Sequence, residues 1–129
     1  MRPDWSSLFL MEQRDWSSRV SAAVGRQVAL HRTAQGLSLR AVAEELGRRG
    51  HEIDRSTLSK IEFGKRSVTV ADLLALANVL NVAPVALMVE LDEAAGPQPV
   101  EVANESFMPA FAFVEWWSGR LQSGVPGSD

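Results

Sequence analysis

Apolar residues recur every three or four positions along most of this chain of 129 residues, and capping residues or glycines interrupt them at short intervals. The first apolar series runs from Trp16 to His31 through three valines. Asp15 or Ser17 can cap its start, and Gly36 can end it. Such spacing gives a helix one apolar face that must be buried. The chain is therefore expected to build its core from helices.

Four more short helices are predicted before residue 91. They begin after Ser38, Asp54 and Thr69 and at the "APVALMV" segment, residues 83–89, so that each start has a polar cap or a first-turn proline. The side chains expected to point inward are Leu39, Val42, Ala43 and Leu46 in the second helix, Leu58 and Ile61 in the third, and Val70, Leu73, Leu74, Ala77 and Leu80 in the fourth. Because the connections are brief, these apolar stripes can be buried only against one another. An all-α bundle of five helices is the predicted fold.

Charge is sorted along the chain. Residues 14–70 hold eleven Arg or Lys and six Asp or Glu, a net charge of +5, whereas residues 71–129 hold one and eight, a net charge of −7. The middle of the chain can therefore approach a polyanion although the whole chain carries −3. The alternative is that these cations only keep helical surfaces soluble.

The third predicted helix, residues 54–63, carries the most specific chemistry. Asp54 caps its start and Gly64 stops it. Its outward residues are hydrogen-bond donors: Arg55, Ser56, Ser59 and Lys60. In the major groove of DNA, Arg and Lys donate to guanine, and Ser contacts base edges or phosphates. Any one of these residues alone fits a solvated surface, so the order and spacing of the wider segment must decide.

Three motifs follow one another in that segment: Gly-Leu-Ser at residues 36–38, RSTLSKIE at residues 55–62, and Gly-Lys at residues 64–65. Together with the apolar pattern over residues 24–87, they resemble the phage-repressor-like helix-turn-helix family of XRE type. The tail at residues 100–102 and 109–119 is similar to that of actinobacterial members. This resemblance implies a five-helix regulator of transcription, a repressor, that binds double-stranded DNA as a homodimer.

The resemblance also implies roles for individual residues, because in this family the third helix reads the major groove and the second lies across the DNA backbone. Arg55, Ser56 and Lys60 match residues that read base edges. The residues that match phosphate contacts are Thr57, Lys65 and Arg66, with Arg40 as a further candidate. Arg32 and Glu62 match an ion pair between the first and third helices. The connection "RRGHEI", residues 48–53, is longer by about one helical turn than in compact members.

The remaining chain is predicted to extend this domain at both ends. Residues 1–14 form an N-terminal extension, residues 15–90 the helix-turn-helix domain, residues 91–106 an acidic linker with a short extended piece at residues 100–102, and residues 107–129 an aromatic helix and tail. The helix at residues 107–117 is apolar on more than one side. It can cap the bundle, form a ligand site with its two tryptophans, or provide a dimer or partner surface. The residues of that surface are Phe107, Phe111, Val114, Trp116 and Trp117.

Several function classes find no support in the sequence. No apolar run approaches the roughly 18 residues that span a bilayer, so a cytoplasmic protein is expected. The chain has no Cys, and its two His residues, His31 and His51, are far apart, so neither metal nor cofactor is expected. No phosphate-binding loop or catalytic grouping indicates an enzyme. The alternative to a DNA-binding regulator is an antitoxin or adaptor whose aromatic segment binds a protein partner.

Overall fold

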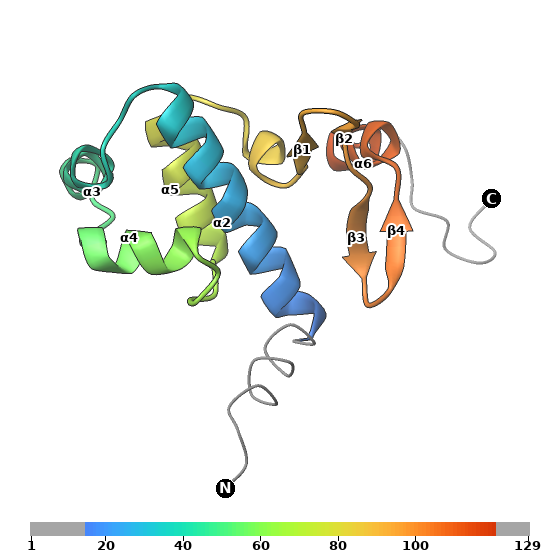
Figure 1. Ribbon diagram of the computed structural model, residues 1–129, viewed down its shortest axis with the longest axis horizontal. Helices are drawn as coiled ribbons and strands as arrows, with labels where there is room; N and C mark the ends of the chain where they lie inside the picture. Colours follow the sequence, from blue (N-terminus) through green and yellow to red (C-terminus); the bar gives the residue numbers. More distant parts are fainter. Residues whose placement is uncertain (1–14, 121–129) are drawn as a thin grey trace, which may run out of the picture.

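The computed structural model describes residues 15–120. The predicted N-terminal extension and residues 121–129 of the predicted tail lie outside the described residues. A bundle of five helical elements is followed by a smaller C-terminal module, which consists of two β-hairpins and one helix within residues 91–117 (Figure 1). The bundle consists of α2 (Trp16–Ala34), α3 (Leu39–Arg48), α4 (Arg55–Glu62), α5 (Val70–Leu80) and the 3-10 helix η1 (Pro84–Leu87). None of the helices described is both long enough and apolar enough to cross a membrane.

Each α-helix of the bundle begins after a cap residue that the sequence identifies. The side chains of Asp15, Ser38, Asp54 and Thr69 accept a hydrogen bond from the backbone N–H three residues further on. Each bond satisfies a donor that the first helical turn would otherwise leave unpaired. Helix α5 ends at Asn81, whose φ of 56° lies in the left-handed region. The four helix starts confirm the local prediction.

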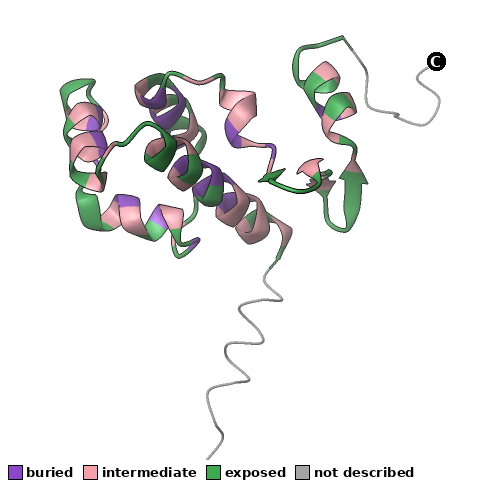
Figure 2. Cartoon of the chain, turned by 45° about the horizontal axis from the view of Figure 1, so that its top comes forward, coloured by how far each residue is buried: buried purple, intermediate pink, exposed green. Residues whose placement is uncertain are grey.

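The core lies where the apolar stripes of all five elements meet (Figure 2). Its buried members are Val24, Val28, Val42, Leu46, Ile53, Leu58, Ile61, Leu76, Ala77, Leu80 and Leu87. Helix α4 contributes only Leu58 and Ile61, both fully buried, as predicted. The outward residues Arg55, Ser56 and Lys60 of this short helix are therefore left exposed to solvent.

Helix α5 turns a different face inward than predicted. Val70 and Leu74, expected in the core, are 74% and 55% exposed, whereas Leu76 is fully buried. Ala77 and Leu80 are buried as expected, and Leu73 packs against the core from its edge. The sequence VADLLALANVL is apolar nearly all round, so its periodicity does not define one face. Packing against the neighbouring helices decides the orientation instead.

The fifth predicted helix is shorter than expected. Residues 83–89 form only η1, one turn closed by bonds from Ala86 N–H to the Ala83 carbonyl and from Met88 N–H to the Val85 carbonyl. Such bonds span three residues and rarely continue beyond one turn. Leu87 still closes the bundle core, and the chain then leaves the bundle.

The chain is mostly helical, as predicted, but it is not strictly all-α, because two short β-hairpins follow η1 within residues 91–108. Strand β1 (Leu91–Asp92) pairs with β2 (Gly96–Pro97), and β3 (Val100–Ala103) pairs with β4 (Ser106–Met108), both antiparallel. The extended piece at residues 100–102 is confirmed as part of β3. Strands of two to four residues are too short to show the alternation that identifies a strand in a sequence.

The aromatic helix α6 (Ala110–Trp117) begins three residues later than expected, because Phe107 lies in strand β4. Pro109 occupies its N-cap position without a side-chain cap bond, and Gly119 follows its end with a φ of 83°. Phe113 is buried, but it is not part of the bundle core. Helix α6 therefore does not cap the bundle.

Polar contacts hold the C-terminal module to the N-terminal half of α2. The Trp16 indole N–H donates to the Glu101 carbonyl at 2.8 Å, and the Arg19 guanidinium donates to both carboxylate oxygens of Glu101 at 3.0 and 2.8 Å. Further along α2, Arg26 makes a similar two-bonded pair with Glu90. The bidentate geometry fixes orientation as well as distance. The module is thus attached to the same helix that packs against α4.

Candidate nucleic-acid interface

Helix α4 presents a polar face directly opposite its two core residues. That face carries the four residues predicted to contact bases: Arg55, Ser56, Ser59 and Lys60. At 3.6 residues per turn they fall within an arc of about 140°, facing away from Leu58 and Ile61. Arg55, Ser56 and Lys60 are exposed, and Ser59 is half-buried. The structure therefore brings the predicted base-contacting residues together on one accessible surface.

The cations of this region differ from those elsewhere in the described chain. Within residues 15–120, only Arg55, Lys60 and Lys65 lie outside ion-pair distance of every carboxylate. Every other Arg in that range has a carboxylate partner, so most of the positive charge counted in the sequence is neutralised locally. The unpaired cations are confined to α4 and the turn that follows it.

Arg40 and Thr57, both predicted near phosphates, occupy different environments. Arg40 is exposed at the start of α3, and because its pair with Glu44 is long, at 3.9 Å, and exposed, the pair is weak and leaves the guanidinium available. Thr57 is half-buried in the first turn of α4, where its backbone N–H donates to Asp54. That hydrogen bond lowers the pKa of Asp54 below its usual value, so the cap stays ionised.

Arg66, a further predicted phosphate contact, donates to the buried carboxylate of Asp72 at 3.0 Å. On its other oxygen, Asp72 contacts His51 Nε2 at 2.7 Å, and it also accepts the backbone N–H of Thr69 at 2.9 Å. Burial raises the pKa of Asp72, but hydrogen bonds from Thr69 and His51 and the charge of Arg66 outweigh it and hold that pKa below its ordinary value. Arg66 is thus mainly an anchor.

This anchor explains how the long connection before α4 is held. His51 lies in the connection, and Arg66 lies just after α4, so one carboxylate on α5 holds both flanks of the helix. Sequence analysis missed the contact, because Thr69 identifies a helix start but gives no sign that Asp72, three residues later, is buried. The only available signal was the position of His51 in the partly polar connection, residues 48–53, that leads into α4.

The predicted ion pair between the first and third helices is present. Arg32 donates from Nε and Nη2 to the two carboxylate oxygens of Glu62 at 2.7 and 2.9 Å. Its third nitrogen donates to the Leu37 carbonyl at 2.8 Å. The hydrogen bonds to Glu62 raise the pKa of Arg32 above its ordinary value, so the guanidinium stays charged. One side chain therefore links α2, the turn before α3 and the end of α4.

Two glycines let α4 approach α2 unusually closely. A Cβ at Gly25, in the middle of α2, would overlap the backbone carbonyl of Ile61. Gly64, with a φ of +70°, faces Ala22 so closely that a Cβ there would lie 2.9 Å from the Ala22 Cβ. The C-terminal half of α4 is thus set against α2 by backbone contact. Sequence analysis identified Gly64 as a helix stop but did not identify Gly25.

Comparison with known proteins agrees with this geometry. Residues 28–87 match the model of the helix-turn-helix family HTH_3. This confirms the sequence resemblance for that segment, whereas the likeness of the tail to actinobacterial members stays a prediction. No curated protein matches the chain.

Three solved structures are similar to the helix-turn-helix domain. The restriction-modification controller protein C.AhdI from Aeromonas hydrophila is 30% identical, with 56% of this chain and 97% of that chain covered and a TM-score of 0.49. The DNA-binding domain of BldD is 32% identical, with 56% and 97% covered and a TM-score of 0.48. An HTH_3 family transcriptional regulator from Vibrio cholerae is 28% identical with a TM-score of 0.49; 55% of this chain is covered, and the chain spans only 37% of that regulator.

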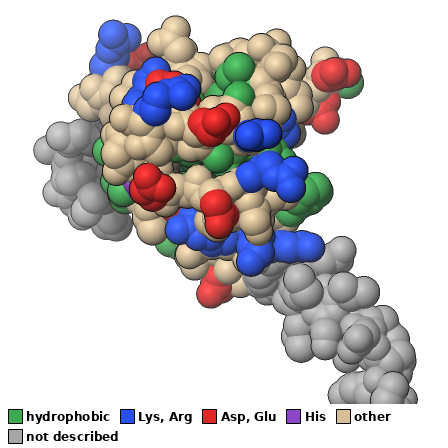
Figure 3. All heavy atoms as spheres, turned by 90° about the vertical axis from the view of Figure 1, so that its left-hand side faces the viewer, with side chains coloured by type: hydrophobic (Ala, Val, Ile, Leu, Met, Phe, Trp, Pro, Cys, Tyr) green, Lys and Arg blue, Asp and Glu red, His purple; other side chains and the backbone are tan. Residues whose placement is uncertain are grey.

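The surface of the helix-turn-helix domain around α3 and α4 is not uniformly basic. A shallow hollow of about 590 Å³ lies between these helices, with Arg40, Arg48 and Arg55 at its edge beside Glu44, Glu52 and Asp54. Figure 3 shows cationic and acidic side chains side by side on this face. A mixed surface of this kind favours contacts at defined positions over indiscriminate attraction to a polyanion.

Proposed function

We propose that this chain is a sequence-specific DNA-binding transcriptional regulator, a repressor, that reads the major groove with α4. One observation carries the proposal: the only cations within residues 15–120 that lack a carboxylate partner are Arg55, Lys60 and Lys65. Free donors on an exposed helix face are what base edges and phosphates require. The family match supports a DNA-binding regulator and not an enzyme.

The three free cations have different roles in this proposal. Arg55 and Lys60 project from the outward face of α4 and reach base edges, with Ser56 and Ser59 between them. Lys65 follows the helix and holds a phosphate. Because phosphate contacts position a protein whereas base contacts specify the sequence, removal of either kind has a distinct signature.

Replacing Arg55 with alanine is expected to weaken binding to the selected operator by about 1 to 3 kcal/mol and to relax the preference at one base pair. Lys65→Ala is expected to weaken binding to all sequences alike. The slope of log affinity against log salt concentration should fall by about the amount that one phosphate contact contributes. Selection from a random DNA library, followed by titration of each variant on the selected site, measures both effects.

Arg120→Ala is the matched control for losing one cation, because Arg120 is exposed and lies at the far end of the described chain. Its affinity and selected site should equal those of the wild type. If Arg55→Ala also leaves both unchanged, α4 is not the reading helix.

The proposal includes a homodimer. Helix α4 is about 12 Å long, so it can span only about three or four base pairs. Pairing of two chains doubles the site. The outward stripe of α6 supplies an apolar surface in Phe111 and Val114, which are 76% and 43% exposed. An isologous interface needs such a patch on both copies.

Phe111→Glu is therefore expected to convert a dimer into a monomer, because the interface would bury an unpaired carboxylate. Size exclusion with light scattering measures the mass. Leu91→Glu is the control, since Leu91 is 49% exposed on β1, outside α6, and this variant should stay dimeric. A wild-type chain that is monomeric at high concentration contradicts the homodimer and favours the alternative function, an antitoxin or adaptor that offers this stripe to another protein.

A further inference from the structure

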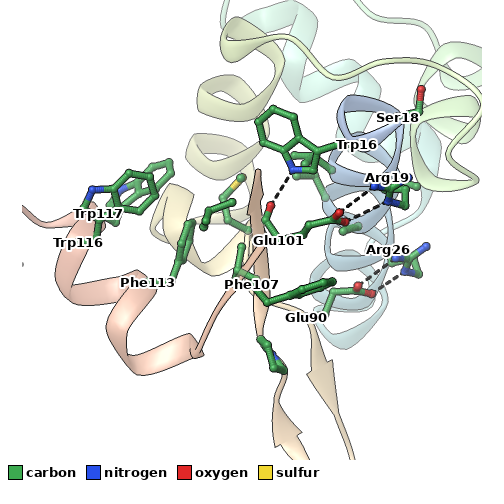
Figure 4. A pocket seen from close by; sticks show the side chains of 18 residues that line it. Trp16, Ser18, Arg19, Arg26, Glu90, Glu101, Phe107, Phe113, Trp116 and Trp117 are labelled. Atoms are coloured by element: carbon green, nitrogen blue, oxygen red, sulfur yellow. Dashed lines mark hydrogen bonds and ion pairs between the residues drawn. The ribbon is translucent and has the colours of Figure 1, made fainter. Parts of the chain in front are cut away.

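A large apolar pocket lies between the N-terminal half of α2 and the C-terminal module. Its volume is about 1040 Å³, at the upper end of the size that small-molecule sites reach. Its aromatic lining comes from three elements: Trp16 on α2, Phe107 on β4, and Phe113, Trp116 and Trp117 on α6. Figure 4 shows Trp116 and Trp117 on one side of the pocket and Trp16 on the other. The α4 surface takes no part in this site.

The charged side chains in the pocket lining are paired with one another. Arg19 pairs with Glu101, Arg26 pairs with Glu90, and the Trp16 indole N–H is bonded to the Glu101 carbonyl (Figure 4). A charged ligand would have to break one of these bidentate pairs to find a partner. An uncharged ligand has no such requirement. The electrostatics of the pocket therefore select against ions.

The ring geometry favours a ligand that itself carries rings. The ring centroids of Phe113 and Trp116 are 6.0 Å apart and the ring planes meet at 63°. The centroids of Phe113 and Trp117 are 5.8 Å apart, with an angle of 49° between the planes. These tilted rings form a corner into which another ring can fit edge to face. Trp116 and Trp117 remain partly exposed although they line the pocket. Covering them would remove apolar surface from water, which is favourable.

We propose that this pocket binds an uncharged, ring-bearing small molecule, and that its occupancy changes the placement of α4. A second copy of this chain is not the proposed occupant, because the surface assigned to the dimer lies outside the pocket lining. The stripe of Phe111 and Val114 points away from the pocket lining and is free to form the proposed dimer. One short helix thus offers one face to a ligand and the other to a partner.

The coupling passes through α2, whose residues line the pocket on one side and touch α4 on the other. Ala22 belongs to the pocket lining, and it is also the residue against which Gly64 lies. Gly25, one turn further along, is in backbone contact with Ile61. A ligand that shifts or rotates this part of α2 therefore moves the end of α4. This step rests on the proposed function, whereas the pocket itself does not.

The first test uses the full chain and two fluorescent probes that differ by one charge. N-phenyl-1-naphthylamine is uncharged and is expected to bind once per chain, with blue-shifted emission and energy transfer from the pocket tryptophans. The related 8-anilinonaphthalene-1-sulfonate is expected to bind at least about tenfold more weakly, because burial of an unpaired sulfonate is costly. Equal affinities for both probes would overturn the assignment of an uncharged ligand.

Variants locate the probe. Ala23→Phe should fill the pocket from α2 and Trp116→Ala should remove part of its wall, so each should lower affinity for N-phenyl-1-naphthylamine about tenfold or more. Leu91→Ala, on an exposed residue of β1 outside the pocket lining, should leave it unchanged. If Leu91→Ala acts like Trp116→Ala, or if Ala23→Phe has no effect, the probe does not occupy this pocket. A probe affinity that falls as protein concentration rises would assign the pocket to a second copy instead.

The second test measures affinity for the selected operator with and without N-phenyl-1-naphthylamine. A change of severalfold in the wild type that is lost in Ala23→Phe supports the coupling. An unchanged affinity with a fully occupied pocket overturns the coupling. If the chain binds no DNA sequence at all, the proposed function fails, and the probe titrations alone still decide whether the pocket is a ligand site.

Discussion

Replacing Gly25 with alanine is expected to lower the free energy of unfolding by about 2 to 3 kcal/mol, in the upper part of the range for overpacked sites. The added Cβ would overlap the backbone carbonyl of Ile61, and a backbone atom cannot move aside as a flexible side chain can. Helix α4 must therefore move away from α2. Urea denaturation measures the loss of stability. Titration with operator DNA should show an apparent affinity that is lowered in proportion to the fraction of the protein that stays folded.

Gly47→Ala is the control for the intrinsic effect of this substitution in a helix. Gly47 lies within α3, and a Cβ there would have Glu52 Oε1 as its nearest neighbour at 3.6 Å, an ordinary contact. Since alanine is the better helix former, this variant should gain about 0.5 to 1 kcal/mol. Should Gly25→Ala behave like Gly47→Ala in stability and DNA affinity, the close packing of α4 against α2 would not hold it in place.

Local signals in the sequence were sufficient to predict the four α-helices of the bundle and the outward face of α4. Caps act within three residues, and the two inward residues of α4 define its orientation whatever surrounds it. Helix α5 shows the limit of this reasoning. Its sequence is apolar nearly all round, so the inward face was decided by neighbouring helices, and two residues expected inside, Val70 and Leu74, lie outside.

Contacts between distant residues could not be predicted from local patterns. Trp16 and Glu101 are 85 residues apart, and nothing near either one indicates that an indole and a backbone carbonyl will meet. The same holds for His51 and Asp72, and for the small residue at Gly25 that admits the end of α4. Arg32 and Glu62 were identified only because the surrounding motifs resemble a known family. Chemistry on the surface of one helix was thus predictable, whereas the contacts that position that helix were not.

Substitutions of Arg32 and Glu62 are expected to be strongly coupled in their effects on the free energy of unfolding. The two side chains are only 15% and 7% exposed, so Arg32→Ala would leave a nearly buried carboxylate without its partner. Breaking a buried pair costs about 3 to 5 kcal/mol, and the residual exposure of Arg32 favours the lower end. The variant that lacks both charges should lose less stability than the sum of the two single losses. Urea denaturation of the four proteins in a double-mutant cycle measures a coupling of about 0.5 to 3 kcal/mol.

Arg40 and Glu44 supply the matched surface pair for this cycle, since both side chains are largely exposed and 3.9 Å apart. They should show almost no coupling. If the stability losses of the Arg32 and Glu62 substitutions add in the same way, the bidentate contact between these residues does not stabilise the fold.

The same pair also tests how α4 is oriented for DNA. Arg32 joins α2 to the Leu37 carbonyl and to the last residue of α4, so it acts on the tilt of that helix and not on any base. Glu62→Gln keeps the shape and one acceptor oxygen but loses the charge. It is expected to weaken binding to all operator variants while leaving the preferred sequence unchanged, the opposite of the local loss of preference expected for Arg55→Ala. A selected site that changes at one position in Glu62→Gln would instead mean that this carboxylate reaches the DNA, because only a residue in contact with a base pair alters the choice at that pair alone.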